Sequence, residues 1–258
     1  MATELIFAEE RQNKILSMLK IRNKLLVNEL CEEFSVSSAT IRNDLNQLEK
    51  KGLLKRTHGG AISCSKASFE PTSSQKAQTN SEKKRQIAEY AVNLIENGDT
   101  LAIDTGTTTY YLAELLSLKS NITVITTDIN IANLLESFPN VTVILAGGML
   151  RRGFSCTTGS ITNMILESFN VDKVFLATNA VTPSGDICTP DIEQAKVKQS
   201  LISIGKQTFL LCDSSKFGTH SFARFGSIRD IDTVITDSDL DENIQLRIKE
   251  QGINLITV

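Results

Sequence analysis

The chain has 258 residues, of which 41% are hydrophobic and 22% are charged, a composition typical of a folded globular protein rather than a disordered or fibrous one. The net charge of −3 argues against a protein that coats nucleic acid with its whole surface. The longest stretches without a charged residue, Ser137 to Leu150 and Gly153 to Leu166, have 14 residues each, fewer than the roughly 18 to 20 that span a membrane. The acidic residues near the start are atypical of a secretory signal, so we expect a cytoplasmic protein with no membrane partner.

Apolar residues at helical spacing predict three helices in the first fifty residues. The first covers about Phe7 to Lys20, the second covers VNELCEEFS, and the third follows Ser37 as its N-cap and stops at Gly52. The next sequence, LLKRTHGGAIS, predicts a hairpin of two short strands that turns at Gly59 and Gly60. Together these elements predict an α+β winged helix-turn-helix domain over residues 1–62.

The start of the third helix carries residue types that read DNA. In a helix-turn-helix the second helix of the motif lies in the major groove, where arginine and asparagine make bidentate hydrogen bonds to bases. Positive charge is concentrated between Ile41 and His58, which holds five basic residues and two acidic ones. The predicted DNA-binding residues are Ser37, Ser38, Ala39, Thr40, Arg42 and Asn43 on the helix and Arg56, Thr57 and His58 on the hairpin. The alternative is a three-helix packing module whose exposed charges are merely solvated.

This region resembles a known family over about fifty residues. The sequences RQNKILSMLK and VSSATIRNDLNQLEKKGLLKRTHGGA are similar to the DNA-binding domain of DeoR-type bacterial transcriptional regulators. In that family a Thr-Ile-Arg-Arg-Asp-Leu core and an Arg-Thr-His-Gly-Gly wing are expected. Asn43 departs from the pattern, because the family usually has a second arginine there. The resemblance implies double-stranded operator DNA as a partner and leaves the operator sequence open.

The rest of the chain changes character twice. Residues 63–81 are rich in Ser, Thr and Gln, which predicts a linker. Over residues 82–258 the apolar runs TLAID, ITVIT, VTVILA, KVFLAT, TFLLC and TVIT alternate with helical patterns near 83–96, 107–117, 129–137, 160–168, 191–205 and 240–250. This alternation predicts a second, α/β domain with a largely parallel, open, Rossmann-like sheet.

The sequence from Asp104 to Thr109, DTGTTT, lies where the first predicted strand turns into a helix. Backbone amides at a helix N-terminus, a glycine and threonine hydroxyls are a phosphate-binding combination, although ordinary turns have the same composition. The turn lacks a Walker lysine and GxGxxG spacing, which disfavours nucleotides. The polar turns TTDIN, AGGMLRRG, ATNAVTPSGD and CDSSKFG follow other strands, and in a parallel sheet such turns meet at one edge. We therefore expect one pocket for an anionic ligand.

About 175 residues of this half resemble the DeoR-type sensor domain, an isomerase- and CoA-transferase-like fold related to ribose phosphate isomerase. The sequences that carry the resemblance are GDTLAIDTGTTT, DINIANLL, ILAGGMLRR, TTGS, TPDIEQAKVKQSLI and LLCDSSKFG. It implies a phosphorylated sugar or sugar derivative at the loop Gly106 to Thr109, near Asp213 and Lys216. Thr127 replaces the Asn of the family's Thr-Asn pair and Gln194 replaces an expected Glu, so the resemblance does not identify the sugar. The predicted effector-binding residues are Asp104, Gly106, Thr107, Thr108, Thr109, Thr126, Thr127, Gly147, Gly148, Asn179, Gln194, Lys198, Asp213 and Lys216.

Catalysis and metal binding are not expected. An ungapped comparison puts the isomerase's catalytic carboxylates at Lys198, Leu176 and Asn179, none of which is a carboxylate. The five cysteines, Cys31, Cys64, Cys156, Cys188 and Cys212, have no metal-ligand spacing, so we expect buried free thiols.

The overall prediction is a transcriptional repressor responsive to a sugar phosphate. We expect no cofactor, and we expect a dimer or higher homo-oligomer because helix-turn-helix proteins normally read paired half-sites. Residues 82–258 are expected to be both the effector-binding sensor and the oligomerisation domain. An enzyme acting on phosphorylated sugars and a protein-interaction module without DNA contact are the alternatives.

Overall fold

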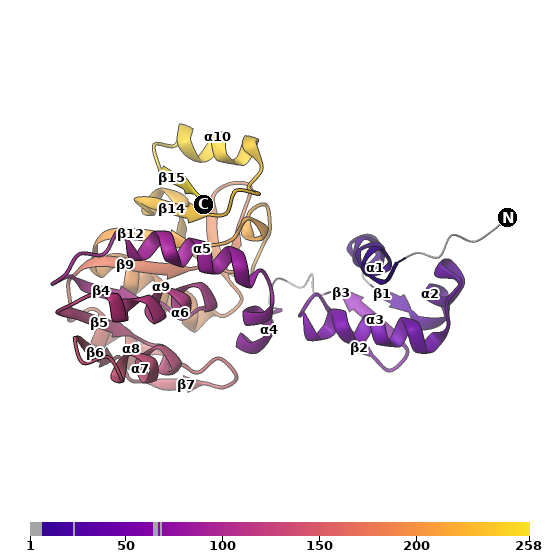
Figure 1. Cartoon of the computed structure of the whole chain (residues 1–258), viewed down its shortest axis with the longest axis horizontal. Coiled ribbons are helices and arrows are strands. Elements are labelled where there is room, and N and C mark those ends of the chain that lie inside the picture. The colour runs from indigo at the N-terminus through magenta and orange to yellow at the C-terminus, as the bar shows by residue number, and fades with distance from the viewer. Residues whose placement is uncertain (1–6, 23, 64–66, 68) are drawn as a thin grey trace. The chain divides into compact units, whose positions relative to one another are not determined.

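The computed structural model describes residues 7–22, 24–63, 67 and 69–258, in two compact units, Met1–Thr79 and Asn80–Val258 (Figure 1). The segment 63–81, expected to be a linker, contains the helix α4 (Ser73–Gln78) and reaches the start of α5 (Ser81–Val92). Across the described ranges, no helix has both the length and the apolar character needed to cross a membrane.

The first unit holds three helices and a small antiparallel sheet. The helices are α1 (Ala8–Arg22), α2 (Val27–Phe34) and α3 (Ser38–Lys50), and the sheet order is β1 (Lys24–Leu26), β3 (Gly60–Ser63), β2 (Leu54–Thr57). All three predicted helices are present, and α3 ends before Gly52, whose φ of 71° stops it as predicted. Strand β1 was not predicted. Buried apolar residues from all three helices and the three strands form one core, which fixes the winged helix-turn-helix.

The hairpin turns one residue earlier than expected. Thr57 lies opposite Gly60 in the β2–β3 ladder, so His58 and Gly59 form the turn, and the prediction of Gly59 and Gly60 is wrong by one position. Gly60 belongs to β3 and pairs with β1. A Cβ at Gly60 would lie 2.0 Å from the carbonyl oxygen of Leu25, so only glycine allows the three strands to come this close.

A parallel sheet is the centre of the second unit, as the alternating pattern predicted; it has seven strands, of which six correspond to the predicted apolar runs and the edge strand at the C-terminus was not predicted. Its order is β15 (Asn254–Thr257), β14 (Thr233–Thr236), β12 (Gly205–Leu211), β9 (Val171–Ala177), β4 (Thr100–Ile103), β5 (Ile122–Thr126) and β6 (Val141–Leu145). Two smaller sheets accompany it: β10 (Ala180–Val181), β11 (Asp186–Thr189) and β13 (Ala223–Ser227), and the hairpin β7 (Met149–Arg151) with β8 (Cys156–Thr158).

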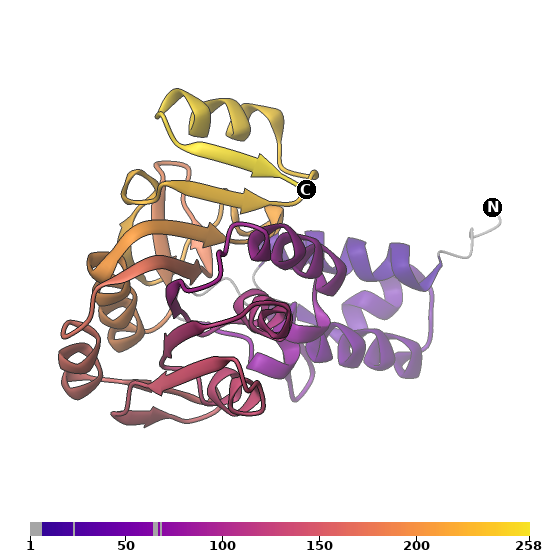
Figure 2. The same cartoon turned by 60° about the vertical axis from the view of Figure 1, so that its left-hand side comes forward.

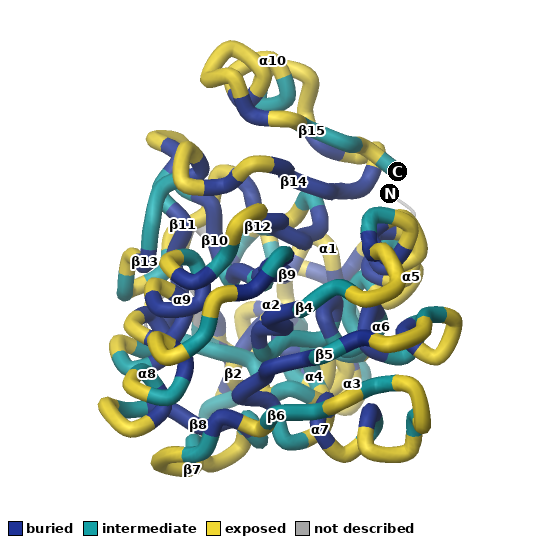
Figure 3. The backbone as a smooth tube through the Cα atoms, turned by 90° about the vertical axis from the view of Figure 1, so that its left-hand side faces the viewer, coloured by how far each residue is buried: buried dark blue, intermediate teal, exposed yellow. Residues whose placement is uncertain are grey.

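Helices cover both faces of the parallel sheet (Figure 2). One core lies against α5, α6 (Thr107–Glu114) and α7 (Ile129–Glu136), with the 3-10 helix Leu115–Leu118. The other lies against α8 (Ser160–Leu166), α9 (Ile192–Ile204), α10 (Glu242–Glu250), the β10–β11–β13 sheet and the 3-10 helix Ile228–Asp230. Neighbouring strand residues alternate between the two cores, for example Phe175 and Leu176 in β9. Figure 3 shows the resulting buried interior and exposed rim.

The strand order reverses direction between β4 and β9. The chain adds β5 and β6 on one side of β4, then crosses over and adds β9, β12, β14 and β15 on the other side. In open parallel sheets, ligands bind beyond the carboxyl ends of the strands at such a switch point. The fold therefore points to the segments that follow β4 and β9.

Three of the cysteines, Cys156, Cys188 and Cys212, are buried free thiols, as expected. Cys31 is also free but only half-buried, and Cys64 lies outside the described residues.

Candidate DNA interface and effector site

The first turns of α3 present an exposed polar face. Ser37 caps the helix, since its hydroxyl accepts a hydrogen bond of 3.2 Å from the Thr40 backbone amide. Four of the predicted DNA-binding residues are exposed, as contact with bases requires: Ser38, Ala39, Arg42 and Asn43. Arg42 makes no ion pair with any residue that the structure describes. The guanidinium of Arg42 is therefore available to a ligand outside the chain.

The β2–β3 hairpin, which is the wing, is hydrogen-bonded to α3. Arg56 donates from Nη1 to Asn46 Oδ1 at 2.6 Å, and its backbone amide donates to Glu49 Oε1 at 2.8 Å. Through these bonds Arg56 holds the hairpin against α3, a role that the sequence did not predict for it. Thr57 is half-buried and His58 is exposed at the turn. Asn46, which the sequence analysis missed, lies four residues after Arg42 and therefore extends the same exposed face.

A buried carboxylate orients α3 within the first unit. Asp44 Oδ2 accepts a hydrogen bond from Arg11 Nε at 2.6 Å, and Asp44 Oδ1 accepts one from Gln12 Nε2 at 3.1 Å. Both Arg11 and Gln12 lie on α1, so the polar contacts fix the rotation of α3 about its axis. The side of α3 opposite to Asp44 is thereby held toward solvent.

In the second unit, a buried ion pair lies at the switch point of the sheet. Asp104 follows β4 and is fully buried, and its Oδ2 accepts from Lys198 Nζ and, at 2.9 Å, from the backbone amide of Ala177. Lys198 Nζ also donates to the Ala177 carbonyl oxygen at 2.8 Å. The pair therefore ties the ends of β4 and β9 to α9.

Helix α6 begins beside this pair without a side-chain cap. Its N-cap residue is Gly106, whereas Asp128 caps α7 and Asp191 caps α9 at the same edge. A Cβ on Gly106 would lie 2.7 Å from the Ala177 Cβ, so the close approach of the loop to β9 requires glycine. The backbone amides in the first turn of α6 thus carry a partial positive charge with no anionic side chain on them.

The threonines of the loop divide into two groups. Thr109 donates to the Gly106 carbonyl oxygen at 3.0 Å, and Thr126 donates to the Ile103 carbonyl oxygen at 2.7 Å. Both are fully buried. The Thr109 hydroxyl holds the loop in place, and the Thr126 hydroxyl joins the end of β5 to the end of β4. Thr107 is half-exposed and remains the hydroxyl of the first turn that is open to solvent.

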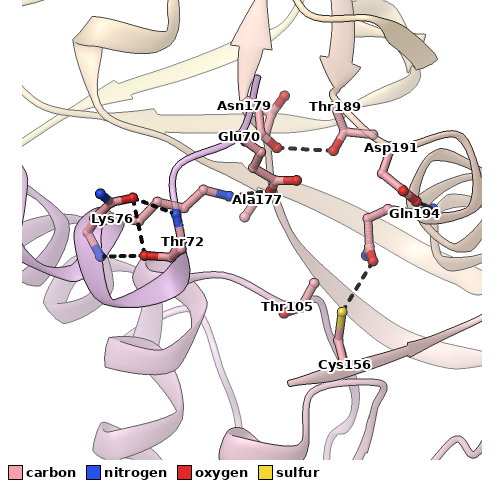
Figure 4. Close-up of polar contacts among 12 residues, drawn as sticks. Glu70, Thr72, Lys76, Thr105, Cys156, Ala177, Asn179, Thr189, Asp191 and Gln194 are labelled. Atoms are coloured by element: carbon pink, nitrogen blue, oxygen red, sulfur yellow. Dashed lines mark hydrogen bonds and ion pairs between the residues drawn. The ribbon is translucent and has the colours of Figure 1, made fainter. Parts of the chain in front are cut away.

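Two residues that the sequence analysis missed extend the site. Asp128 Oδ2 accepts from Thr105 Oγ1 at 2.6 Å; burial raises the pKa of Asp128, and the hydrogen bonds from Thr105 and from two backbone amides offset only part of that shift. Cys156 Sγ lies 3.5 Å from Gln194 Oε1 (Figure 4). Burial raises the pKa of Cys156 to about 11, so the thiol stays protonated. Its S–H group therefore donates a hydrogen bond to Gln194 Oε1. An aspartate directly before a helix, as in TTDIN, is a sequence signal for Asp128.

Several buried polar atoms of the second unit have no hydrogen-bond partner among the described residues, and three of them belong to this site: Asp104 Oδ1, Thr127 Oγ1 and Gln194 Nε2. Buried polar groups nearly always have a partner, so such atoms mark a place for a ligand or ordered water. The set consists of one acceptor, one hydroxyl and one donor. A polyol, whose hydroxyls both donate and accept, matches this set.

The remaining predicted residues of this edge make internal bonds. The Gly147 carbonyl oxygen accepts from Thr162 Oγ1 at 3.0 Å, and Gly148 has a φ of 154° in the turn before β7. Asn179 Oδ1 accepts from Thr189 Oγ1 at 3.1 Å (Figure 4). These contacts shape the loops after β6 and β9.

Asp213 and Lys216 lie in a cluster after β12, the strand next to β9, and Asp213 Oδ2 is another buried atom without a hydrogen-bond partner among the described residues. Asp213 Oδ1 accepts from Asn80 Nδ2 at 2.9 Å, and Lys216 Nζ lies 3.9 Å from Asp213 Oδ2. Burial acts to raise the pKa of Asp213, but the charge of Lys216 and the hydrogen bonds from Ser215 and Asn80 outweigh it, so the pKa lies below its usual value. Lys83 adds an ion pair of 2.7 Å to Asp237 in the neighbouring loop.

Comparisons with known proteins agree with both units. A family model described as the DeoR-like helix-turn-helix domain matches residues 11–67, and one described as the DeoR C terminal sensor domain matches residues 79–238. The glycerol-3-phosphate regulon repressor of Escherichia coli K12 is 34% identical to the chain, covering 95% of it and 97% of the relative. The lactose phosphotransferase system repressor of Staphylococcus epidermidis is 36% identical, covering 89% and 92%. The solved ribose 5-phosphate isomerase A of Methanocaldococcus jannaschii is 16% identical, with a TM-score of 0.40 over 54% of this chain and 55% of that one.

Proposed function

Since the chain belongs to the DeoR family of helix-turn-helix transcriptional regulators, we propose that it represses a sugar-uptake or sugar-catabolism operon and that a phosphorylated sugar controls its binding to DNA. Relatives named as repressors of a glycerol-3-phosphate regulon and of a lactose phosphotransferase system support this class of target and effector. The first unit supplies the DNA-reading surface and the second unit supplies the sensor.

The observation that carries the effector proposal is the uncapped start of α6 beside the three unpartnered buried atoms. The first-turn amides favour an anion such as a phosphate, because the helix dipole and the free N–H groups point at it. Asp104 Oδ1, Thr127 Oγ1 and Gln194 Nε2 match the hydroxyls of a sugar. Both halves of a sugar phosphate thus find complementary groups at one edge of the sheet.

We infer that this edge binds the sugar phosphate without converting it. Aldose–ketose isomerisation needs a free carboxylate to move a proton between carbons. Asp104 is neutralised by Lys198, and the carboxyl oxygens of Asp128 accept hydrogen bonds from Thr105, Asn130 and Ile131. The effector then binds more tightly to the conformation or assembly that holds DNA poorly, and this difference in affinity shifts the population of the protein away from the DNA-bound state.

Arg42→Ala tests the proposal. We expect binding to the protein's own promoter DNA, measured by gel shift, to weaken about 10- to 100-fold, because one bidentate contact to a base contributes roughly 1–3 kcal/mol. Stabilisation of the same variant by sugar phosphates, measured by thermal shift, should equal that of the wild type.

Arg247→Ala is the matched control, since it removes an exposed arginine from α10 in the sensor. Unchanged promoter affinity in Arg42→Ala contradicts the DNA interface. Conversion of any sugar phosphate by the wild-type protein contradicts the inference of binding without catalysis.

A further inference from the structure

One end of the sensor unit exposes large apolar side chains that no described element covers. They lie on two neighbouring elements, the β7–β8 hairpin and α8 (Figure 3). The residues are Met149, Leu150, Ile161 and Met164, which are between 55% and 67% exposed. We call this set the apolar end. Other exposed apolar residues of the unit, such as Leu118, Phe222 and Leu246, are scattered singly.

The hairpin and α8 form one continuous surface. Thr162 in α8 donates to the Gly147 carbonyl oxygen at 3.0 Å, which fixes the start of α8 against the turn between β6 and β7. A Cβ on Gly159 would lie 4.0 Å from the Met149 Cβ, so β7 and the first turn of α8 are in contact distance. The apolar end is therefore a single patch rather than separate side chains.

Helix α8 is apolar on its outer side as well as on its inner side. Leu166 is buried in the core, while Ile161 and Met164, three residues apart on one face, point outward. The helix SITNMIL has no charged residue, although a surface helix normally carries charges on its solvent face. A helix of this kind needs a partner on both sides.

The apolar end coincides with the two longest charge-free stretches of the chain, Ser137–Leu150 and Gly153–Leu166. In the fold these stretches form β6, most of the hairpin and α8; the two charges between them are Arg151, which pairs with Asp191, and the exposed Arg152 directly after β7. Loss of charged residues and enrichment in methionine are features of the centre of a protein interface. The opposite edge of the sheet differs, because α10 beside β15 carries Glu242, Arg247, Lys249 and Glu250.

We propose that the apolar end is the surface through which a second copy of this chain binds, around a twofold axis. In a twofold contact each residue near the axis meets its own copy, so a charge there would meet a like charge. A neutral apolar face avoids that repulsion and is complementary to itself. The open edge of β6, which pairs only with β5 among the described strands, lies on the same surface. The inference rests on the proposed function, in which two DNA-reading units act together.

The test measures the mass of the full-length protein by light scattering or sedimentation. We expect more than one copy for the wild type and half of that mass or less for Met164→Glu, since the new carboxylate would face its symmetry copy. Leu246→Glu on α10, which replaces a side chain of 57% exposure compared with 67% for Met164, should keep the wild-type mass. Because Met164 is exposed, its variant should also keep the wild-type unfolding temperature.

Cross-linking gives an independent measurement. A cysteine at position 164, introduced as Met164→Cys, should form covalent dimers with a short bismaleimide far more than the wild type, whose native cysteines set the background. A Met164→Glu variant with the wild-type mass, or cross-linking no greater than background, overturns the apolar end as the contact. A monomeric wild type overturns the paired reading of DNA as well, so the two failures are distinguishable.

Discussion

Asp104 and Lys198 show how single residues hold the sensor edge together. Both are almost completely buried, with exposures of 0% and 2%, so each charge has lost its water. Removing one partner of such a pair typically destabilises a protein by about 3–5 kcal/mol, because the other charge is left unpaired, whereas replacing both partners is far less costly. The pair therefore makes the geometry of the effector site depend on two residues from distant parts of the chain.

We expect Lys198→Met to lower the unfolding temperature strongly, because it leaves the Asp104 carboxylate buried without a cation. The double variant Asp104→Asn/Lys198→Met should recover most of the loss. Lys196→Met is the control on the same helix, since Lys196 is exposed and its ion pair among the described residues is with Glu193 at the surface. Calorimetric melting of the four proteins decides the matter; equal shifts for Lys198→Met and Lys196→Met would be incompatible with a buried pair.

This pairing also marks the limit of what the sequence reveals. Asp104 and Lys198 are 94 positions apart, and no local periodicity connects them. The DTGTTT turn was recognisable because a strand, a glycine and a helix start follow one another along the chain. Thr108 and Thr109 are buried and Thr107 is half-exposed because the loop packs against the end of β9, where Gly106 and Ala177 approach closely, and only the folded chain brings these segments together.

At the scale of elements, the long periodic segments were predictable and the short ones were not. Six strands of the parallel sheet and the main helices have several apolar residues at a regular interval, which is enough to identify them. Strands β1 and β10 have three and two residues, too few to show any period. Helix α4 has no buried residue at all, so its polar composition is typical of a linker. Its capping box, Thr72 with Gln75, was the available signal.

Helix α4 is bonded to the recognition helix within the first unit and comes directly before the second unit in the chain. Six residues are too few for a helix to be stable alone, so its contacts in the first unit hold it. Gln75 Nε2 donates to the Glu49 carbonyl oxygen at 2.9 Å, and Thr79 Oγ1 donates to the Lys51 carbonyl oxygen at 3.2 Å, both at the end of α3. The next residue, Asn80, begins the second unit and donates to Asp213. Neighbouring residues thus contact the recognition helix and the cluster after β12.

We expect Gln75→Ala to weaken the communication between effector and DNA more than either binding event. The variant should bind promoter DNA and sugar phosphate within about threefold of the wild type, while the change in DNA affinity caused by the effector becomes smaller; such coupling is typically worth about 1–3 kcal/mol. Gln78→Ala, an exposed glutamine of the same helix, is the control. Fluorescence anisotropy of labelled promoter DNA, with and without effector, measures the coupling directly. A full effector response in Gln75→Ala argues against α4 as the connection.

At the scale of the whole molecule, charge and assembly depend on each other. The chain has a net charge of −3, which repels DNA, while five of its basic residues lie between Ile41 and His58 on the reading surface. One reading unit therefore contacts few phosphates, so its binding depends on salt less steeply than the binding of two linked units. In the proposed assembly, two copies joined through the apolar end would hold the second reading unit near the second half-site, which raises affinity without any new contact.

Met164→Glu should separate these two contributions. We expect the variant to bind a duplex with one half-site as tightly as the wild type, because residue 164 lies in the sensor unit and α3 is unchanged. On a duplex with two half-sites the wild type should gain about 10²- to 10⁴-fold from linkage, and the variant should lose most of that gain. Its dependence on salt should also fall toward that of a single reading unit. Leu246→Glu should keep the full gain in the same anisotropy titrations at two salt concentrations. If Met164→Glu keeps the two-site advantage, the copies meet elsewhere; if it also loses the single half-site, the substitution has damaged the fold rather than the assembly.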